Sequence, residues 1–237
     1  MKLKTVEAII HRFSHRALLR TARIGESATF PLWLKLLALL FLYIFVSYSW
    51  RNYGLQNFLW FSCLGVIGTV LALWLENRML ASMMLLSTFV ADEIAWGGDF
   101  LLRLIFGWQP VGATAYMFDQ RLPLAGRSIS LYHFVIPALL IWMVHKLRYD
   151  TRALAAQTLL SSIVLVLSFT LTNPANNINW VFGFGIKPQL YVPAWIYLVG
   201  EMIFFPVVFY LPLHLLLKKS GWHRPRNARY VVEDSPV

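Results

Sequence analysis

Cysteine is nearly absent from the sequence, since Cys63 is the single one among 237 residues. No intramolecular disulfide can form, and neither a cysteine zinc knuckle nor an iron–sulfur cluster can be built from this chain. Several motifs with a known mechanism are missing too: GxGxxG, GxxxxGK[ST], HExxH and the GxxxG packing motif. The sequence therefore predicts no metal site and no cofactor.

Charge is also scarce. Only 14% of the residues are charged, whereas 58% are hydrophobic and 16% are aromatic. A soluble domain is roughly 25% charged, so this composition is typical of a membrane protein. The formal net charge of +10 is interpreted as a signal of membrane topology and not of nucleic-acid binding. The expected partner is the lipid bilayer, with no nucleic acid.

Six long apolar runs predict an all-α fold, a polytopic bundle of six transmembrane helices, because about 20 residues cross about 30 Å of hydrocarbon. The runs cover residues 31–49, 58–75, 79–102, 129–144, 154–171 and 191–217. One transmembrane domain is expected over residues 30–217, after a basic segment 1–29 and before a basic tail 218–237. Pro206 and Pro212 predict a kink in the sixth helix.

The basic residues predict the orientation of the bundle. Most of the 21 Lys and Arg residues fall in the amino-terminal segment, the second and fourth loops, and the tail. Cytoplasmic segments collect Lys and Arg, so both termini are expected to be cytoplasmic. Arg12, Arg16, Arg20 and Arg23 share one helical stripe beside an apolar stripe, which predicts an amphipathic interfacial helix on anionic lipid.

Ionisable side chains inside the spans are the candidate functional residues, since a charge in hydrocarbon costs roughly 3 kcal/mol. With the amino terminus inside, Cys63 and His133 lie at a similar depth, roughly 6 to 8 Å below the outer face. An Asn-rich outer loop covers that level, and Glu201 falls near mid-membrane. The predicted pocket is made of Cys63 and His133 together with Asp92, Glu93, Asp99, Asn177, Asn179, Trp180 and Glu201.

Structural alternatives remain open for these residues. Cys63 can be an inert small hydrophobe, and His133 a ring at the membrane interface. Asp99 and Arg103 have the spacing of an ion pair on one helix. The adjacent acids Asp92 and Glu93 need either partners or a wet cavity. The long loop 106–127, rich in Gly and Pro, is a candidate lid.

Four stretches carry a resemblance to known proteins: Tyr116-Met-Phe-Asp119, Ser130-Leu-Tyr-His-Phe-Val-Ile-Pro-Ala-Leu-Leu-Ile-Trp142, Tyr149-Asp-Thr-Arg-Ala-Leu154 and Asn177-Ile-Asn-Trp-Val-Phe-Gly183. Over residues 58–217 the chain resembles a family of uncharacterised bacterial polytopic membrane proteins. More distantly it is similar to YwaF-type membrane proteins, the androgen-induced-gene hydrolases and related transmembrane acyltransferases, although Phe61 and Ser62 stand where the YwaF type has a His-Leu pair. The resemblance implies a location in the bacterial inner membrane, with Cys63 as nucleophile and His133 as base.

Two specific functions follow as hypotheses. The first is an intramembrane acyl hydrolase or acyltransferase that acts on a lipid substrate and opens to the outer face, using Cys63 and His133. The alternative is a transporter or ligand-binding membrane protein that uses the intramembrane carboxylates Asp92, Glu93 and Glu201. A structural or partner-binding role is the third reading. The sequence predicts neither the substrate nor the oligomeric state.

Overall fold

The computed structural model describes residues 30–88, 93–185 and 188–224, with the side chains of residues 93–95 excepted. This part of the chain is all-α and contains no strand. The predicted interfacial helix in residues 1–29 lies outside the described residues, as does the end of the basic tail from residue 225. The all-α prediction is confirmed for the described part.

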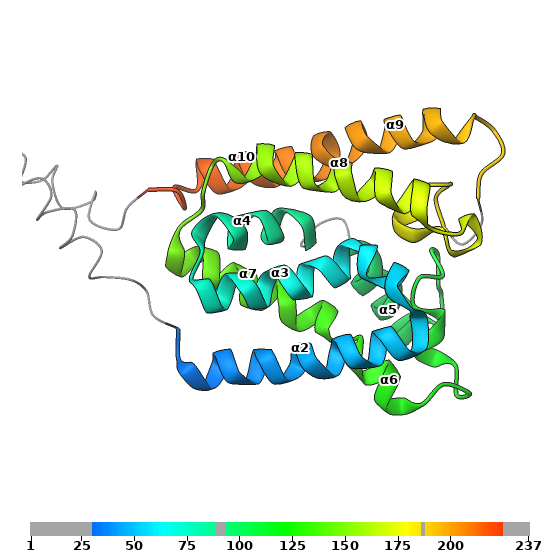
Figure 1. Ribbon diagram of the computed structural model, residues 1–237, viewed down its shortest axis with the longest axis horizontal. Helices are drawn as coiled ribbons and strands as arrows, with labels where there is room; N and C mark the ends of the chain where they lie inside the picture. Colours follow the sequence, from blue (N-terminus) through cyan, green and yellow to red (C-terminus); the bar gives the residue numbers. More distant parts are fainter. Residues whose placement is uncertain (1–29, 89–92, 186–187, 225–237) are drawn as a thin grey trace, which may run out of the picture. The chain divides into compact units, whose positions relative to one another are not determined.

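Helices make up most of the described chain (Figure 1). In chain order they are α2 (Leu32–Tyr53), η1 (Leu55–Leu59), α3 (Phe61–Leu75), α4 (Arg78–Ser87), α5 (Glu93–Phe106), η3 (Ala115–Phe118), α6 (Leu124–Ile129), α7 (Tyr132–Leu147), α8 (Ala153–Leu171), η4 (Pro174–Asn176), η5 (Ile178–Trp180), α9 (Ala194–Phe204), η6 (Phe205–Tyr210) and α10 (Leu211–Lys219). The short α4 packs against α3, α7 and α8, and α2 packs against α3 on the side away from α8.

Four helices are long and apolar enough to cross a membrane: Leu32–Tyr53, Leu124–Leu147, Ala153–Leu171 and Ala194–Lys219. Much of their apolar surface is exposed, above all on α2, where Trp33, Leu36 and Tyr43 are each more than half exposed. Such a surface is unfavourable in water and is the expected one in lipid. These helices define the class of the protein as a multi-pass membrane protein.

The predicted span over residues 79–102 is described in two pieces, because residues 89–92 lie outside the described residues. The two pieces are α4, with 10 residues, and α5, with 14. At about 1.5 Å per residue neither reaches across about 30 Å of hydrocarbon. α4 is apolar because other helices surround it, and six of its residues are buried. Apolar runs in a sequence do not distinguish burial in protein from exposure to lipid. The α3 helix is also short, with 15 residues.

Two glycines allow α3 and α4 to pack closely. A Cβ atom added to Gly65 would collide with the side chain of Thr88, and one added to Gly68 would collide with Met84. Small residues let helix backbones approach in membrane bundles. The two glycines are three residues apart, so a search for GxxxG does not find them.

The sixth predicted span is a continuous run of α9, η6 and α10. Its middle part, Phe205–Tyr210, is a π-helix that contains Pro206, and Pro212 follows at the start of α10. Proline removes a backbone donor, and a π-helical turn is a common way to accommodate that loss. The sequence placed a kink at these prolines, and the structure has the π-helix there.

Candidate functional site

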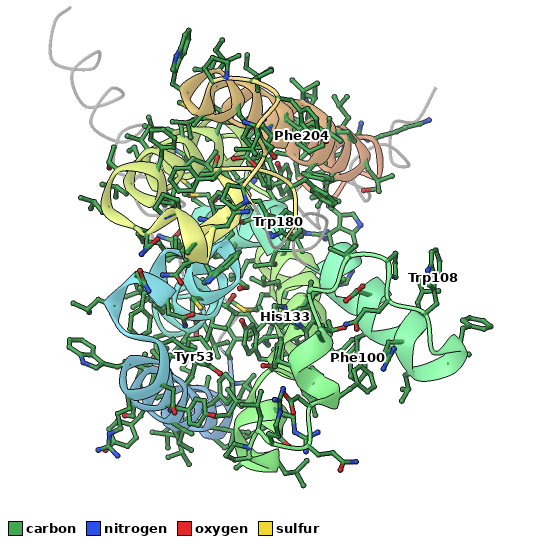
Figure 2. All side chains as sticks on the ribbon, turned by 90° about the vertical axis from the view of Figure 1, so that its right-hand side faces the viewer. Tyr53, Phe100, Trp108, His133, Trp180 and Phe204 are labelled. Atoms are coloured by element: carbon green, nitrogen blue, oxygen red, sulfur yellow. The ribbon has the colours of Figure 1, made fainter. Side chains whose placement is uncertain are left out.

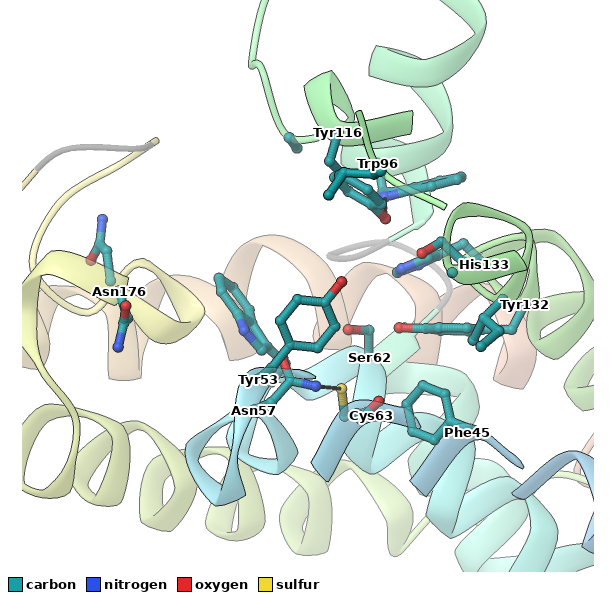
Figure 3. Close-up of a pocket in the computed structure, with 18 of the residues that line it drawn as sticks. Phe45, Tyr53, Asn57, Ser62, Cys63, Trp96, Tyr116, Tyr132, His133 and Asn176 are labelled. Atoms are coloured by element: carbon teal, nitrogen blue, oxygen red, sulfur yellow. Dashed lines mark hydrogen bonds between the residues drawn. The ribbon is translucent and has the colours of Figure 1, made fainter. Parts of the chain in front are cut away.

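A cavity of about 560 Å³ lies where the end of α2, the start of α3, α5 and the start of α7 meet two loops (Figure 3). One, here called loop 107–131, is the connection between α5 and α7 and contains η3 and α6, and the other is the Asn-rich loop after α8. Aromatic rings and neutral polar groups dominate the described part of its wall. The lining includes Phe45, Tyr48, Tyr53, Asn57, Trp60, Ser62, Cys63, Trp96, Tyr116, Ser130, Tyr132, His133, Asn176, Asn177 and Trp180.

Cys63 lies in the first turn of α3 and is 4% exposed. Its sulfur accepts a hydrogen bond from Nδ2 of Asn57 at 3.5 Å, drawn as a dashed line in Figure 3. The first turn of a helix also directs its unpaired backbone N–H groups and its positive dipole end toward such a side chain. Both features stabilise negative charge on the sulfur, which is the form in which cysteine acts as a nucleophile.

The start of α3 is held by a residue far away in the sequence. Trp60, the N-cap residue, provides no side-chain cap. Instead, Oδ1 of Asn179 accepts the Phe61 N–H at 2.9 Å, and Nδ2 of Asn179 donates to the Leu59 carbonyl at 2.7 Å and to Ser168 Oγ at 3.1 Å. Asn179 therefore joins the Asn-rich loop after α8 to the turn that carries Cys63.

His133 lies in the first turn of α7, and its ring is sandwiched between two aromatic rings. The Trp96 ring stacks on one side with centroids 4.4 Å apart at 12°, and the Tyr132 ring on the other at 4.2 Å and 24°. The imidazole is 7% exposed and lies in the interior of the bundle, in contrast to Trp108 on the outside (Figure 2). Stacking on both faces fixes the plane of the imidazole ring.

The stack continues away from the cavity through Phe100 and Phe118. Trp96 and Phe100 are nearly parallel with centroids 5.4 Å apart, and Phe100 stacks on Phe118 at 5.5 Å. Trp96 Nε1 donates a hydrogen bond to the Tyr116 hydroxyl at 3.1 Å. Burial raises the pKa of the Tyr116 phenol, so this hydroxyl stays protonated at neutral pH. The position of His133 thus depends on α5 and the loop 107–131.

Asn177 and Trp180 both line the cavity, as their position in the predicted pocket implies. The Asn177 amide is already committed to the loop: Nδ2 donates to the carbonyls of Gly183 and Gly185, and Oδ1 accepts the Phe182 N–H. Asn177, Asn179 and Trp180 all have positive φ angles, a conformation that Asn tolerates better than most residues. The two asparagines build the loop, and Trp180 contributes a ring to the wall.

The described carboxylates are not part of the cavity lining. Asp99 is buried and accepts hydrogen bonds from five donors in the following loop: Gln109 Nε2, the N–H groups of Val111, Gly112 and Thr114, and the Thr114 hydroxyl. The Asp99 carboxylate thereby fixes the backbone at the start of loop 107–131. Arg103, the ion-pair candidate for Asp99, donates to the Gly107 carbonyl and lies 5.6 Å from the centre of the Phe118 ring.

Three further predicted site residues are Glu201, Asp92 and Glu93. Glu201 is buried in α9 and does not line the cavity. Asp92 and the side chain of Glu93 lie outside the described residues. Their predicted roles stay predictions.

Several lining residues were not among those predicted. Asn57, Tyr53 and Ser62 come from the segment around the start of α3, and Trp96 and Tyr132 flank His133. Ser62 and Tyr132 are the sequence neighbours of Cys63 and His133, and this adjacency is the one sequence feature that could have indicated them. No sequence pattern indicates that the Trp96 ring stacks on His133.

No family model, curated protein or solved structure matches this chain. The class of the protein therefore rests on its four span-length helices, and its function on the cavity.

Proposed function

We propose that the protein is an acyl hydrolase or acyltransferase of the bacterial inner membrane, with Cys63 as nucleophile and His133 as general base. The observation that carries the proposal is that the first turns of α3 and α7 bring these two side chains to the wall of one cavity. The resemblance to YwaF-type proteins and transmembrane acyltransferases assigns the same two residues the same roles. A lipid with an ester or thioester is the proposed substrate.

The chemistry follows from the groups in the wall. His133 takes the proton of the Cys63 thiol, and the sulfur attacks the carbonyl carbon of the lipid ester. The C–S bond forms, the C–O bond breaks, and the alcohol leaves with the proton from His133. Water or an acceptor alcohol then releases the acyl group from the sulfur. In this proposal, backbone N–H groups in the first turn of α3 stabilise the oxyanion.

The fold supports the topology proposed with this function, in which both termini are cytoplasmic and the cavity faces outward. Three basic segments meet at the end of the bundle away from the cavity loops (Figure 1). Arg78 Nη2 donates to the Tyr149 carbonyl at 2.6 Å, and the Tyr149 N–H donates to the Trp222 carbonyl at 3.0 Å. Placing these segments in the cytoplasm agrees with the positive-inside rule.

Thiol labelling tests the pair directly, because Cys63 is the one thiol in the chain. We expect a maleimide to alkylate wild-type protein in membranes about tenfold or more faster than the His133→Gln variant. His145→Gln is the matched control, because His145 lies in the last turn of the same helix. Equal rates for wild type and His133→Gln would remove the general base from the proposal.

The alternative, a transporter that uses intramembrane carboxylates, has less support from the cavity. Asp99 is committed to its loop, and Glu201 lies away from the cavity lining. A flux assay that responds to Glu201→Gln but not to Cys63→Ser would favour this alternative over acyl transfer.

A further inference from the structure

A second site with a chemistry of its own lies in α9, at Glu201. Its side chain is 8% exposed, and it does not line the cavity. Oε2 is fully buried and has no hydrogen-bond partner among the residues that the structure describes. Tyr197 lies one helical turn earlier on the same helix. The proposed acyl transfer makes no use of this carboxyl group.

The helices around Glu201 offer no compensating charge. α9 packs against α8 and runs directly into η6. The sequence of α8 contains no titratable side chain, and the buried part of that helix includes Ser161, Val164 and Leu165. The titratable side chains of α9 and η6 besides Glu201 are Tyr197 and Tyr210, and phenols ionise only in strong base. None of α8, α9 and η6 carries a Lys, Arg or His.

An ionised carboxylate at this position would be a buried, unpaired charge, which is strongly unfavourable in a membrane domain. Binding of one proton removes the charge. Glu76 provides the contrast within the same chain: it is also largely buried, but its Oε1 lies 2.8 Å from Lys35 Nζ. That ion pair stabilises the Glu76 carboxylate without a proton.

We propose that Glu201 is a proton-binding site inside the membrane domain, which holds its proton while α9 is packed against α8 and releases it when that contact opens to water. The π-helix η6, with Pro206, begins four residues after Glu201. Such a segment is a common place for a helix to bend. Proton release is thereby coupled to a movement of α9 about η6. The site is separate from the cavity, so its test does not depend on Cys63.

A hydrophobic carbodiimide is a suitable probe, because it reacts with protonated carboxyl groups inside membranes. The carboxyl proton moves to a carbodiimide nitrogen, the carboxyl oxygen adds to the central carbon, and the adduct rearranges to a stable N-acylurea. We expect dicyclohexylcarbodiimide to modify Glu201 of the full-length protein in lipid vesicles at pH 7, as read by peptide mass spectrometry. Glu76 stays unmodified, and the Glu76→Gln variant retains the modified Glu201 peptide.

Infrared spectroscopy gives a second measurement that needs no reagent. The wild-type protein should show the carbonyl stretch of a protonated carboxyl group at pH 7, and this band should be absent from Glu201→Gln and present in Glu76→Gln. An unmodified Glu201, or an identical infrared band in wild type and Glu201→Gln, would overturn the proposal. Loss of the labelling when sodium is added at constant pH would also overturn it, because the site would then bind a cation.

Discussion

Asn179 provides the most quantitative test of how the site is built. Asn179→Ala removes the acceptor of the Phe61 N–H and the donor to the Leu59 carbonyl, and it leaves both backbone groups without these partners. A lost helix cap costs about 1 kcal/mol, and a buried polar group without a partner costs about 1 to 3 kcal/mol. We therefore expect a destabilisation of about 3 kcal/mol, or roughly 9 °C at about 3 °C per kcal/mol for a chain of this size.

The chain carries its own reporter for this experiment. Cys63 is the single cysteine and is buried, so a thiol-reactive fluorophore reports unfolding of the detergent-solubilised protein as the temperature rises. Asn176→Ala is the matched control, because Asn176 lies in the same loop but is exposed, and a surface substitution of this kind changes stability by less than about 0.5 kcal/mol.

A second variant separates the amide from the backbone conformation. Asn179 has a φ angle of 54°, which alanine adopts with more strain than glycine. Asn179→Gly therefore removes the amide but relieves the strain, and most of the loss should remain. If Asn179→Ala or Asn179→Gly melts within error of Asn176→Ala, Asn179 does not hold the start of α3.

Three further predictions follow from the contacts of Asp99, Gly65 and Asp150. Asp99→Ala should destabilise the protein by about 3 kcal/mol or more, because three buried or part-buried backbone N–H groups lose their acceptor; a protease that cuts loop 107–131 faster than in wild type would report it. Gly65→Val should prevent close packing of α3 and α4 and lower the melting temperature far more than Gly98→Val, where an added Cβ meets open space. The hydrogen bond from the Arg152 guanidinium lowers the pKa of the Asp150 carboxyl, against burial, which raises it. A carboxyl group whose pKa is lower in the folded than in the unfolded state stabilises the fold at pH values above the unfolded pKa of about 3.9, and this stabilisation is lost as the pH falls through the folded pKa. The melting temperature should therefore differ less between pH 5 and pH 3 in Asp150→Asn than in wild type.

The long helices were predictable because their apolar runs are unbroken. The runs at residues 31–49 and 154–171 correspond to α2 and α8, with ends that differ by at most four residues. The run at 79–102 includes α4, which is apolar for another reason, namely burial among α3, α7 and α8. Packing around a short helix is a property of the whole fold, which one apolar run does not contain.

The depth of the site residues along their helices was predictable from the sequence, but the direction of their side chains was not. Counting residues from the outer face put Cys63 and His133 at one level, and the structure brings both to one cavity. Depth along a helix follows from its rise per residue, but the direction of a side chain depends on how the helices pack. For that reason the Trp96 ring on His133 and the loop contacts of Asp99 were not predicted.

Detection of an acyl group on Cys63 shows whether this thiol is the nucleophile of acyl transfer. The protein in vesicles is incubated with a radiolabelled lipid ester, quenched in acid and split in two, and one half is treated with neutral hydroxylamine, which cleaves thioesters. We predict that wild-type protein carries bound label that hydroxylamine removes. Cys63→Ser should lack this labile label, and His133→Gln should carry less of it. Labile label of equal amount in wild type and Cys63→Ser, or none in wild type with any lipid ester tested, would rule out Cys63 as the nucleophile.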